Sequence, residues 1–464
     1  MVRVFRQYIP VPFLVLGVVE FVLFAASVHL GALVYSRYFA AGTVDIGGLS
    51  LWTKELAFAL VMMLAMVAMG LYQRRFRFAM AGMLLRIVTA LIGGAVAISM
   101  IYYVVPFLAV ERGVLAVIIP VAAGLVLTVR VIFIKTLNQD MLKRRILILG
   151  AGEKAAQIPR HLRRRVDQQG FSVVGYVHVR GEHDVVDEGL VLRPDVPLLT
   201  LAKELQADEI VVAVGERRRK TFPVHELLDC KMSGVDVIDL QGFFERETGK
   251  IKLDILNPSW MIFSDGFTQG EYRKRFFDIL ISLALLLITW PFMLLVAMAI
   301  VMESGGRGPV FYKQVRVGQH WKLFHVIKFR SMRVDAEKGG AQWATKNDSR
   351  VTWVGAFIRK VRLDELPQIF NVLRGDMSFV GPRPERPEFV TQLSEQIPYY
   401  SERHRVKPGI TGWAQVCYPY GASEKDSMEK LQYDLYYIKN YSLFLDLVII
   451  LQTAHEVTWG KGGR

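Results

Sequence analysis

Four long apolar segments before residue 140 constrain this chain more than any other feature. They cover residues 11–35, 55–72, 83–107 and 114–134. Each is close to the roughly 20 residues that a helix needs to cross a bilayer. The composition agrees, because the chain is 52% hydrophobic and has a positive mean hydropathy of +0.29. We therefore expect a multi-pass membrane protein with a four-helix transmembrane bundle over residues 1–140.

The flanking charges predict how this bundle is oriented. The loops on one side carry only Arg37, Lys54 and Arg112. The other side carries three basic groups: Arg3 with Arg6, then Arg74, Arg75 and Arg77, then Lys143, Arg144 and Arg145. The positive-inside rule then places both ends of the bundle in the cytoplasm. The first segment lacks a convincing small-residue cleavage site, so we expect no cleavable signal peptide.

The charged residues also narrow the function. A net charge of +14 fits a protein that lies against anionic lipid and handles phosphorylated substrates. Much of this charge flanks apolar segments, so no nucleic-acid partner is expected. Glu20 and His29 lie within the first apolar segment, where packing in the bundle or at a dimer contact explains them better than catalysis. Cys230 and Cys417, the two cysteines, predict neither a cysteine-cluster zinc site nor a disulfide framework.

Alternating strands and helices follow the bundle and predict a small Rossmann-like α/β domain over residues 143–242. The expected strands are 144–150, 171–179, 209–214 and 235–240. Gly150-Ala151-Gly152-Glu153-Lys154-Ala155 is a GxGxxA turn of the kind that cradles phosphate in dinucleotide folds. The acid that would bind a ribose is missing, and His178 lies near its place. We therefore expect a scaffold or regulatory domain rather than a nicotinamide site.

A linker over residues 243–270 leads to a fifth apolar stretch at 276–302. Its length allows a crossing, but a fifth crossing would move the rest of the chain out of the cytoplasm. Pro291 lies near its middle and removes a helix hydrogen bond. Basic residues at both ends can bind one anionic surface. We therefore expect a re-entrant helix that returns to the cytoplasmic face.

The C-terminal part contains adjacent carboxylates, Asp364-Glu365 in LDELPQ, followed by a proline-flanked arginine, Arg383, in GPRP. A carboxylate can attack phosphorus, a second can hold a divalent metal, and arginine can hold phosphate oxygens. Most isolated Asp-Glu pairs are solvated helix starts. This pair is not isolated, because KFRSM (328–332), the segment 347–384 and VKPGITGWAQV (406–416) surround it.

These motifs resemble, in the same order, the catalytic domain of the bacterial sugar transferases, the monotopic phosphoglycosyl transferases. The resemblance covers roughly residues 271–464. The preceding bundle and α/β unit resemble its large subgroup, typified by undecaprenyl-phosphate galactose or glucose phosphotransferase. The opening MVRVFRQYIP and the DGF at 265–267 resemble the exosortase-associated exopolysaccharide branch. The implied fold is a membrane protein of α plus α/β type whose transferase domain carries the re-entrant helix.

The resemblance implies a reaction and its partners. Sugar-1-phosphate would pass from a UDP-sugar to polyprenyl (undecaprenyl) phosphate, releasing UMP, as the initiating step of exopolysaccharide or glycoconjugate synthesis. Asp364 matches the family's nucleophile, which forms a phosphosugar-aspartyl intermediate, and Glu365 matches its Mg²⁺ ligand. The expected location is the bacterial inner membrane, with the catalytic domain on the cytoplasmic face. We also expect a homodimer.

The remaining site residues are basic or lie beside a basic residue. Arg359 matches the family's phosphate-binding arginine, and Arg383, between Pro382 and Pro384, matches its nucleotide-contacting position. Lys328, Arg330, Gln314 and Arg316 match motif positions without a defined role. Asp376, a third nearby acid, fits a helix cap or a supporting role better than that of a nucleophile. Trp353, Ala356 and Trp290 depart from the family pattern; they leave the dyad intact and bear on membrane docking.

Two other functions compete with this interpretation. One is a nucleotide-sugar oxidoreductase or epimerase that uses the α/β unit, but the ribose acid and an evident Tyr-x-x-x-Lys pair are missing beside it. The other is a non-catalytic membrane scaffold for polysaccharide assembly, which the intact carboxylates and arginines argue against. The sequence does not predict which sugar is transferred.

Overall fold

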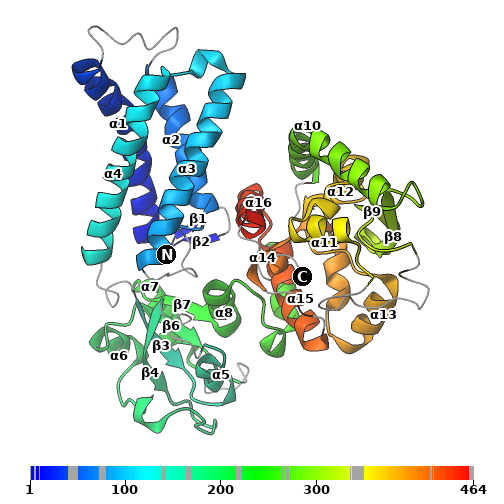
Figure 1. The fold of residues 1–464 in the computed structure, drawn as a ribbon. Coiled ribbons are helices and arrows are strands. Elements are labelled where there is room, and N and C mark those ends of the chain that lie inside the picture. Colours follow the sequence, from blue (N-terminus) through cyan, green and yellow to red (C-terminus); the bar gives the residue numbers. More distant parts are fainter. Residues whose placement is uncertain are drawn as a thin grey trace. The chain divides into compact units, whose positions relative to one another are not determined.

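The computed structural model describes residues 2–4, 7–9, 11–39, 51–72, 80–136, 143–162, 170–215, 222–263, 266–267, 271–334, 336, 350–418, 421 and 423–458. The chain divides into two compact units, with the main boundary between Pro258 and Ser259. We describe each unit by itself (Figure 1). The short strands β1 (Val2–Val4) and β2 (Gln7–Ile9) pair at the N-terminus.

Apolar helices form the first part of the N-terminal unit. They are α1 (Val11–Tyr38), α2 (Leu51–Ala68), α3 (Met80–Val104) and α4 (Arg112–Thr136), with the short turn η1 (Pro106–Leu108). Their buried side chains form one core, to which Phe24, Phe58, Ile98 and Ile118 each contribute from a different helix. All four predicted segments are therefore helical and pack together.

Length and composition identify four candidate membrane spans among the described residues: Val11–Tyr38, Arg86–Val104, Arg112–Phe133 and Tyr272–Glu303. The protein is thus a multi-pass membrane protein. The second predicted segment, α2, is not among these four spans; it is the shortest of the N-terminal helices and carries Lys54 and Glu55 in its first turns. Arg6, Arg74, Arg75 and Arg77 lie outside the described residues, so the orientation stays a prediction.

Glu20 lies inside the helix cluster, as expected. Its side chain is fully buried and accepts two hydrogen bonds from Arg130 on α4, at 2.6 and 2.9 Å. Tyr72 also donates to Glu20. The charge of Glu20 is therefore compensated within the cluster. His29 lies 3.7 Å from Glu55 on α2.

The second part of the N-terminal unit is a parallel sheet with strand order β5-β4-β3-β6-β7. The strands are β3 (Arg144–Leu149), β4 (Phe171–Val177), β5 (Val191–Leu192), β6 (Glu209–Val212) and β7 (Asp236–Asp239). The helices are α5 (Glu153–His161), α6 (Leu198–Glu204), α7 (Val224–Met232) and α8 (Leu240–Thr248), with the turn η2 (Glu188–Leu190). The predicted α/β sheet is confirmed, and β5 is an additional edge strand.

Both faces of this sheet are covered. Leu147 and Leu149 of β3 pack with α6 and α7, whereas Ile146 and Ile148 pack with α5 and α8. This alternation follows from the two-residue period of a strand. Phe243 and Phe244 of α8 are fully buried in that second core. The first residues of the expected linker therefore belong to the α/β core.

The C-terminal unit begins with helices. After the turn η3 (Leu253–Ile255) come α9 (Pro258–Phe263) and the long α10 (Glu271–Glu303), which contains Pro291. Many side chains in the middle of α10 are exposed, among them Leu287 (75%) and Ile288 (66%). Figure 1 shows α10 changing direction along its length. An apolar helix with exposed large side chains fits burial in lipid.

Both ends of α10 contact the same small domain. Near its start, Asp278 accepts hydrogen bonds from the Ser378 hydroxyl at 3.0 Å and the Phe379 amide at 2.9 Å. Near its end, Glu303 accepts from the Val354 amide at 3.1 Å. The apolar middle therefore lies between two anchored ends.

The rest of this unit surrounds two short sheets. The antiparallel pair is β8 (Phe311–Val317) and β9 (Leu323–Phe329), joined by η4 (Gln319–Trp321), and the parallel pair is β10 (Ser378–Val380) and β11 (Gly409–Thr411). The helices and turns are α11 (Trp353–Lys360), η5 (Leu363–Glu365), α12 (Gln368–Arg374), α13 (Pro387–Gln396), η6 (Tyr400–Arg405), α14 (Trp413–Cys417), α15 (Glu424–Lys439) and α16 (Leu443–Thr458).

Candidate active site

A sharp turn between two helices presents the paired carboxylates. Helix α11 starts at a cap in which the Thr352 hydroxyl accepts from the Gly355 amide at 3.0 Å. Past its end, Arg362 adopts a left-handed φ of 56°, which redirects the chain into η5. Leu363 and Leu366, on either side of the carboxylates, pack against an apolar core with Phe329 and Ile358. The dyad therefore sits on a short anchored turn rather than in the first turn of α12.

A buried asparagine aligns β9 with this turn. Asn371 of α12 is fully buried, accepts from the Ile327 amide at 3.0 Å and donates to the His325 carbonyl at 2.8 Å. These two bonds hold β9 at Ile327 and His325. Lys328 consequently places its Nζ 2.8 Å from Oε1 of Glu365.

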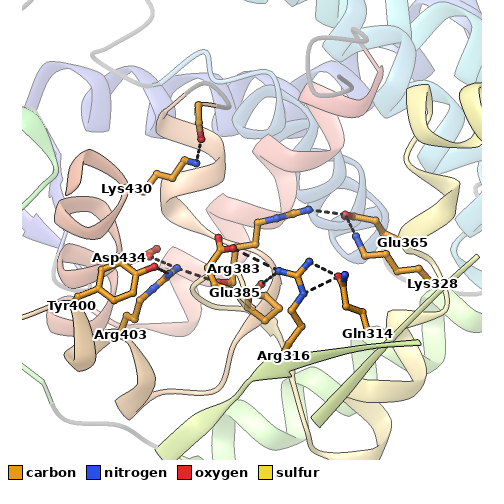
Figure 2. A network of polar contacts seen from close by, with 12 residues as sticks. Gln314, Arg316, Lys328, Glu365, Arg383, Glu385, Tyr400, Arg403, Lys430 and Asp434 are labelled. Atoms are coloured by element: carbon orange, nitrogen blue, oxygen red, sulfur yellow. Dashed lines mark hydrogen bonds and ion pairs between the residues drawn. The ribbon is translucent and has the colours of Figure 1, made fainter. Parts of the chain in front are cut away.

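Cations surround Glu365. Arg383 donates to its Oε1 at 3.1 Å, beside Lys328 (Figure 2). Arg362 lies 3.6 Å from its Oε2. Burial by itself would raise the pKa of this carboxyl, but the charges of Lys328, Arg383 and Arg362 outweigh it and hold the pKa well below its usual range. Glu365 is therefore ionised at neutral pH.

Asp364 is in a different situation from its neighbour. Within the part of the chain that the structure describes, its side chain has no hydrogen bond or ion pair. Burial and the charge of Glu365 raise its pKa to about 6, while Lys328, Arg359 and Arg383 oppose that rise. Asp364 is thus a carboxylate near several cations, and it forms no hydrogen bond or ion pair with any of them among the described residues.

Three more predicted residues lie beside Arg383. Arg316 of β8 donates to Oε1 of Gln314 at 2.6 and 3.1 Å and to the Pro384 carbonyl at 3.0 Å. It also lies 3.6 Å from Glu385. Figure 2 shows this group next to Arg383, whose side chain reaches Glu365. Gln314 and Arg316 therefore lie beside the GPRP loop, and Arg316 contacts it at Pro384.

Arg330 lies elsewhere. It follows the end of β9, and its guanidinium donates to the Arg307 carbonyl at 3.2 Å. It lines a pocket of about 400 Å³ near the end of α10, together with Glu303 and Trp353. No described contact brings Arg330 to the dyad. Asp376 contacts Asn371 at 3.5 Å, which agrees with a supporting role.

Comparison with known proteins identifies the family. The model of the family described as bacterial sugar transferase matches residues 269–460. A UDP-glucose:undecaprenyl-phosphate glucose-1-phosphate transferase of Xanthomonas campestris pv. campestris is 36% identical over 68% of this chain and 67% of its own. The chain belongs to the bacterial sugar transferase family.

Other members of this family are similar over comparable lengths. A UDP-N-acetylgalactosamine-undecaprenyl-phosphate N-acetylgalactosaminephosphotransferase of Aeromonas hydrophila is 40% identical over 61% of this chain and 65% of its own. An undecaprenyl-phosphate glucose phosphotransferase of Komagataeibacter xylinus is 36% identical over 69% and 60%. The match thus spans about two thirds of the length of these bacterial sugar transferases, and their names differ in the sugar.

The carboxylates bear on the metal that the family implies. Among the described residues, no group of three or more His, Cys, Asp or Glu side chains could hold a metal ion. Mg²⁺, however, is commonly held by one or two carboxylates together with substrate phosphates. Asp364 and Glu365 supply such a donor set. The residues therefore fit a Mg²⁺ that arrives with a diphosphate substrate.

The glycine turn of the α/β unit is filled by the chain itself. Gly150 has a φ of 113°, which suits glycine, and the turn precedes α5 as predicted. Glu182, from the loop after β4, accepts from the Gly215 amide, and its Oε2 lies 3.3 Å from the point that a Cβ on Gly152 would occupy. The Val185 amide donates to the Ala151 carbonyl at 2.8 Å. A carboxylate therefore lies against the second glycine of this turn.

Sequence reasoning missed several residues of the site. Arg362 directly precedes the dyad motif, and its position in VRLDE could have signalled its role. Asn371 looked like an ordinary polar residue of a helix. Arg403 and Asp434 join the network from η6 and α15, and no local motif marks either of them.

Proposed function

We propose that this protein transfers sugar-1-phosphate from a UDP-sugar to undecaprenyl phosphate and releases UMP, as the first step in building an exopolysaccharide or glycoconjugate. The observation that carries the proposal is Asp364, a carboxylate that is not engaged by the cations around it, beside the buried and ionised Glu365. The relatives named above carry out transfers of this class on different UDP-sugars.

The proposed chemistry has two balanced steps. An Asp364 oxygen forms a bond to the β-phosphorus, and the bond from that phosphorus to the bridging oxygen breaks, so that UMP leaves. A phosphate oxygen of undecaprenyl phosphate then attacks the same phosphorus, the bond to Asp364 breaks, and the polyprenyl-diphosphate sugar leaves. Two displacements through one carboxylate give ping-pong kinetics.

The basic residues have separate roles in this proposal. Arg359 and Lys328, whose charges act on Asp364, offset the negative charge of the incoming diphosphate. Arg383 binds the nucleotide phosphates. Glu365 would hold Mg²⁺, which supplies further charge neutralisation when it is bound. Arg330 contacts the Arg307 carbonyl near the end of α10 rather than the dyad, so we assign it no role at the diphosphate.

We also propose that α10 is re-entrant and that the dyad faces the cytoplasm, where nucleotide sugars are made. Support comes from Pro291, from the exposed apolar middle of the helix and from the hydrogen bonds at Asp278 and Glu303, which tie both ends to one domain. Single-cysteine labelling near residues 274 and 306, in a chain lacking Cys230 and Cys417, tests this. Labelling of both sites from the cytoplasm is expected, and labelling from opposite faces would mean a spanning helix. A homodimer stays a prediction.

A release assay tests the proposed activity. The purified full chain is incubated with undecaprenyl phosphate, Mg²⁺ and a panel of UDP-sugars that includes UDP-glucose and UDP-N-acetylgalactosamine, and UMP is measured. UMP release that requires undecaprenyl phosphate for turnover supports the transferase. Reduction of an added nicotinamide cofactor would indicate an oxidoreductase instead. If the assay yields neither UMP nor a reduced cofactor, the remaining interpretation is a non-catalytic scaffold.

A further inference from the structure

A buried ion pair holds the main chain of the loop that carries Arg383. Arg403 of η6 is 6% exposed and Asp434 of α15 is 2% exposed. One Arg403 nitrogen donates both to Asp434 at 2.9 Å and to the carbonyl of Arg383 at 3.0 Å. Its other terminal nitrogen donates to the Tyr400 hydroxyl at 2.6 Å. Figure 2 shows this group on the far side of Arg383 from Glu365.

Every residue of the GPRP loop has a main-chain atom in a hydrogen bond with another part of the domain. The Gly381 amide donates to Thr411 at 2.8 Å, and the Pro382 carbonyl accepts from Gly409 at 2.9 Å. The Arg383 carbonyl accepts from Arg403, and the Pro384 carbonyl accepts from Arg316 at 3.0 Å. Two guanidinium groups from distant elements therefore hold consecutive carbonyls.

Apolar side chains could pack beside this loop without a buried ion pair. A buried ion pair is often no more stabilising than an apolar pair of similar volume, so it is weak evidence for a stabilising role. A planar guanidinium, however, donates in fixed directions and can orient an acceptor. Only the main chain of Arg383 is fixed by this contact, and its side chain is what reaches Glu365.

We propose that Arg403, paired with Asp434, is a positioning residue that fixes the main chain of Arg383, so that the Arg383 guanidinium faces the dyad and the nucleotide phosphates. This rests on the proposed function for the identity of the substrate. Arg403 does not touch the substrate. It acts through Arg383, and Arg316 plays the same part for Pro384.

The test is a cycle of variants in the full-length protein. Arg403→Met with Asp434→Leu removes both buried charges together, so that no charge is left unpaired, and frees the Arg383 carbonyl. In the otherwise unchanged chain, kcat/KM for the active UDP-sugar should fall about 10²-fold, the cost of misplacing a binding group by about 1 Å. In an Arg383→Ala background the same pair of changes should add less than about twofold, because linked residues are not additive.

A conservative variant and a local measurement complete the test. Arg403→Lys can still donate to Asp434 and to the Arg383 carbonyl but lacks the fixed donor directions of a guanidinium, so kcat/KM should fall by less than about tenfold. Hydrogen–deuterium exchange over residues 378–386 should be faster in the double variant than in the wild type and nearly unchanged in Arg403→Lys. Equal losses in both backgrounds, or unchanged exchange in the double variant, would overturn the proposal. A wild-type chain that releases no UMP would refute the proposed function instead, and the exchange measurement would still decide the positioning role.

Discussion

Two phosphate motifs of this chain have opposite surroundings. The turn at Asp364-Glu365 brings Lys328, Arg362 and Arg383 to one carboxylate and leaves the other unengaged. The glycine turn at 150–152 has the backbone of a phosphate cradle, but Glu182 lies in it. A motif therefore specifies a local backbone, and side chains from distant elements determine whether a phosphate can bind there.

The surroundings of the two sites also differ in charge. Around the dyad, the net effect of the cations is strong enough to keep a buried glutamate ionised. At the glycine turn, the acid Glu182 lies beside Gly152, and the nearby cation Lys154 donates to the Gly215 carbonyl at 3.0 Å. Because like charges repel, a diphosphate would have to displace Glu182 before it could bind. The charges around the first site therefore favour an incoming diphosphate, whereas the charge of Glu182 opposes one at the second.

The largest effect should come from removing the unengaged carboxylate. Asp364→Asn keeps the size of the side chain but removes the attacking oxygen's charge, so turnover should fall by at least about 10⁴-fold. Mass spectrometry after incubation with donor alone should show a phosphosugar adduct on Asp364 in the wild type and none in the variant. Asp376→Asn is the matched control, since it removes an acid that contacts Asn371, and should cost far less. A wild-type rate for Asp364→Asn would mean that another group is the nucleophile.

Many elements of both regions were predicted from the sequence. The apolar helices, strands β3, β4, β6 and β7, and the dyad with Arg359 and Arg383 were all predicted, because each depends on local periodicity or on a contiguous motif. The positions of Arg403, Asp434 and Glu182 were not, because their partners are distant in sequence. Arg330 shows the same limit. It follows Lys328 by two residues, but β9 ends at Phe329, so strand alternation no longer fixes its direction.

A smaller loss is expected from neutralising the engaged carboxylate. Glu365→Gln keeps the shape but removes the charge that holds Lys328 and Arg383, so kcat should fall about 10²-fold. The Mg²⁺ concentration needed for half-maximal rate should also rise if Glu365 is a metal ligand. Measuring rate against Mg²⁺ for the wild type, Glu365→Gln and Glu365→Asp separates the two effects. An unchanged Mg²⁺ requirement in all three would remove Glu365 from the metal site.

Acidification should reduce activity because Asp364 must be ionised to attack. Burial and the charge of Glu365 raise its pKa to about 6, so the reactive form predominates above that pH and is lost as the pH falls through it. Below the pKa, kcat/KM should drop about tenfold per pH unit. The pH profile of UMP release measures this. Arg359→Gln removes one of the charges that oppose the rise, so its limb should move to higher pH, and a shift to lower pH would contradict the arrangement of charges described here.

The smallest effect on transfer is expected at the glycine turn. Glu182→Ala removes the carboxylate beside Gly152, and Gly152→Ala adds a methyl group whose carbon would lie 3.3 Å from that carboxylate. Neither residue belongs to the unit that carries Asp364, so UMP release should stay within about twofold. It should also be independent of added nicotinamide dinucleotide. Calorimetry with NAD then sharpens the contrast between the two motifs: the wild type should show no binding, and binding gained in Glu182→Ala alone would identify the carboxylate as the group that closes the turn. Tight binding by the wild type, or UMP release that depends on the dinucleotide, would show that a dinucleotide can displace Glu182. Both motifs would then bind phosphate groups, despite their different surroundings.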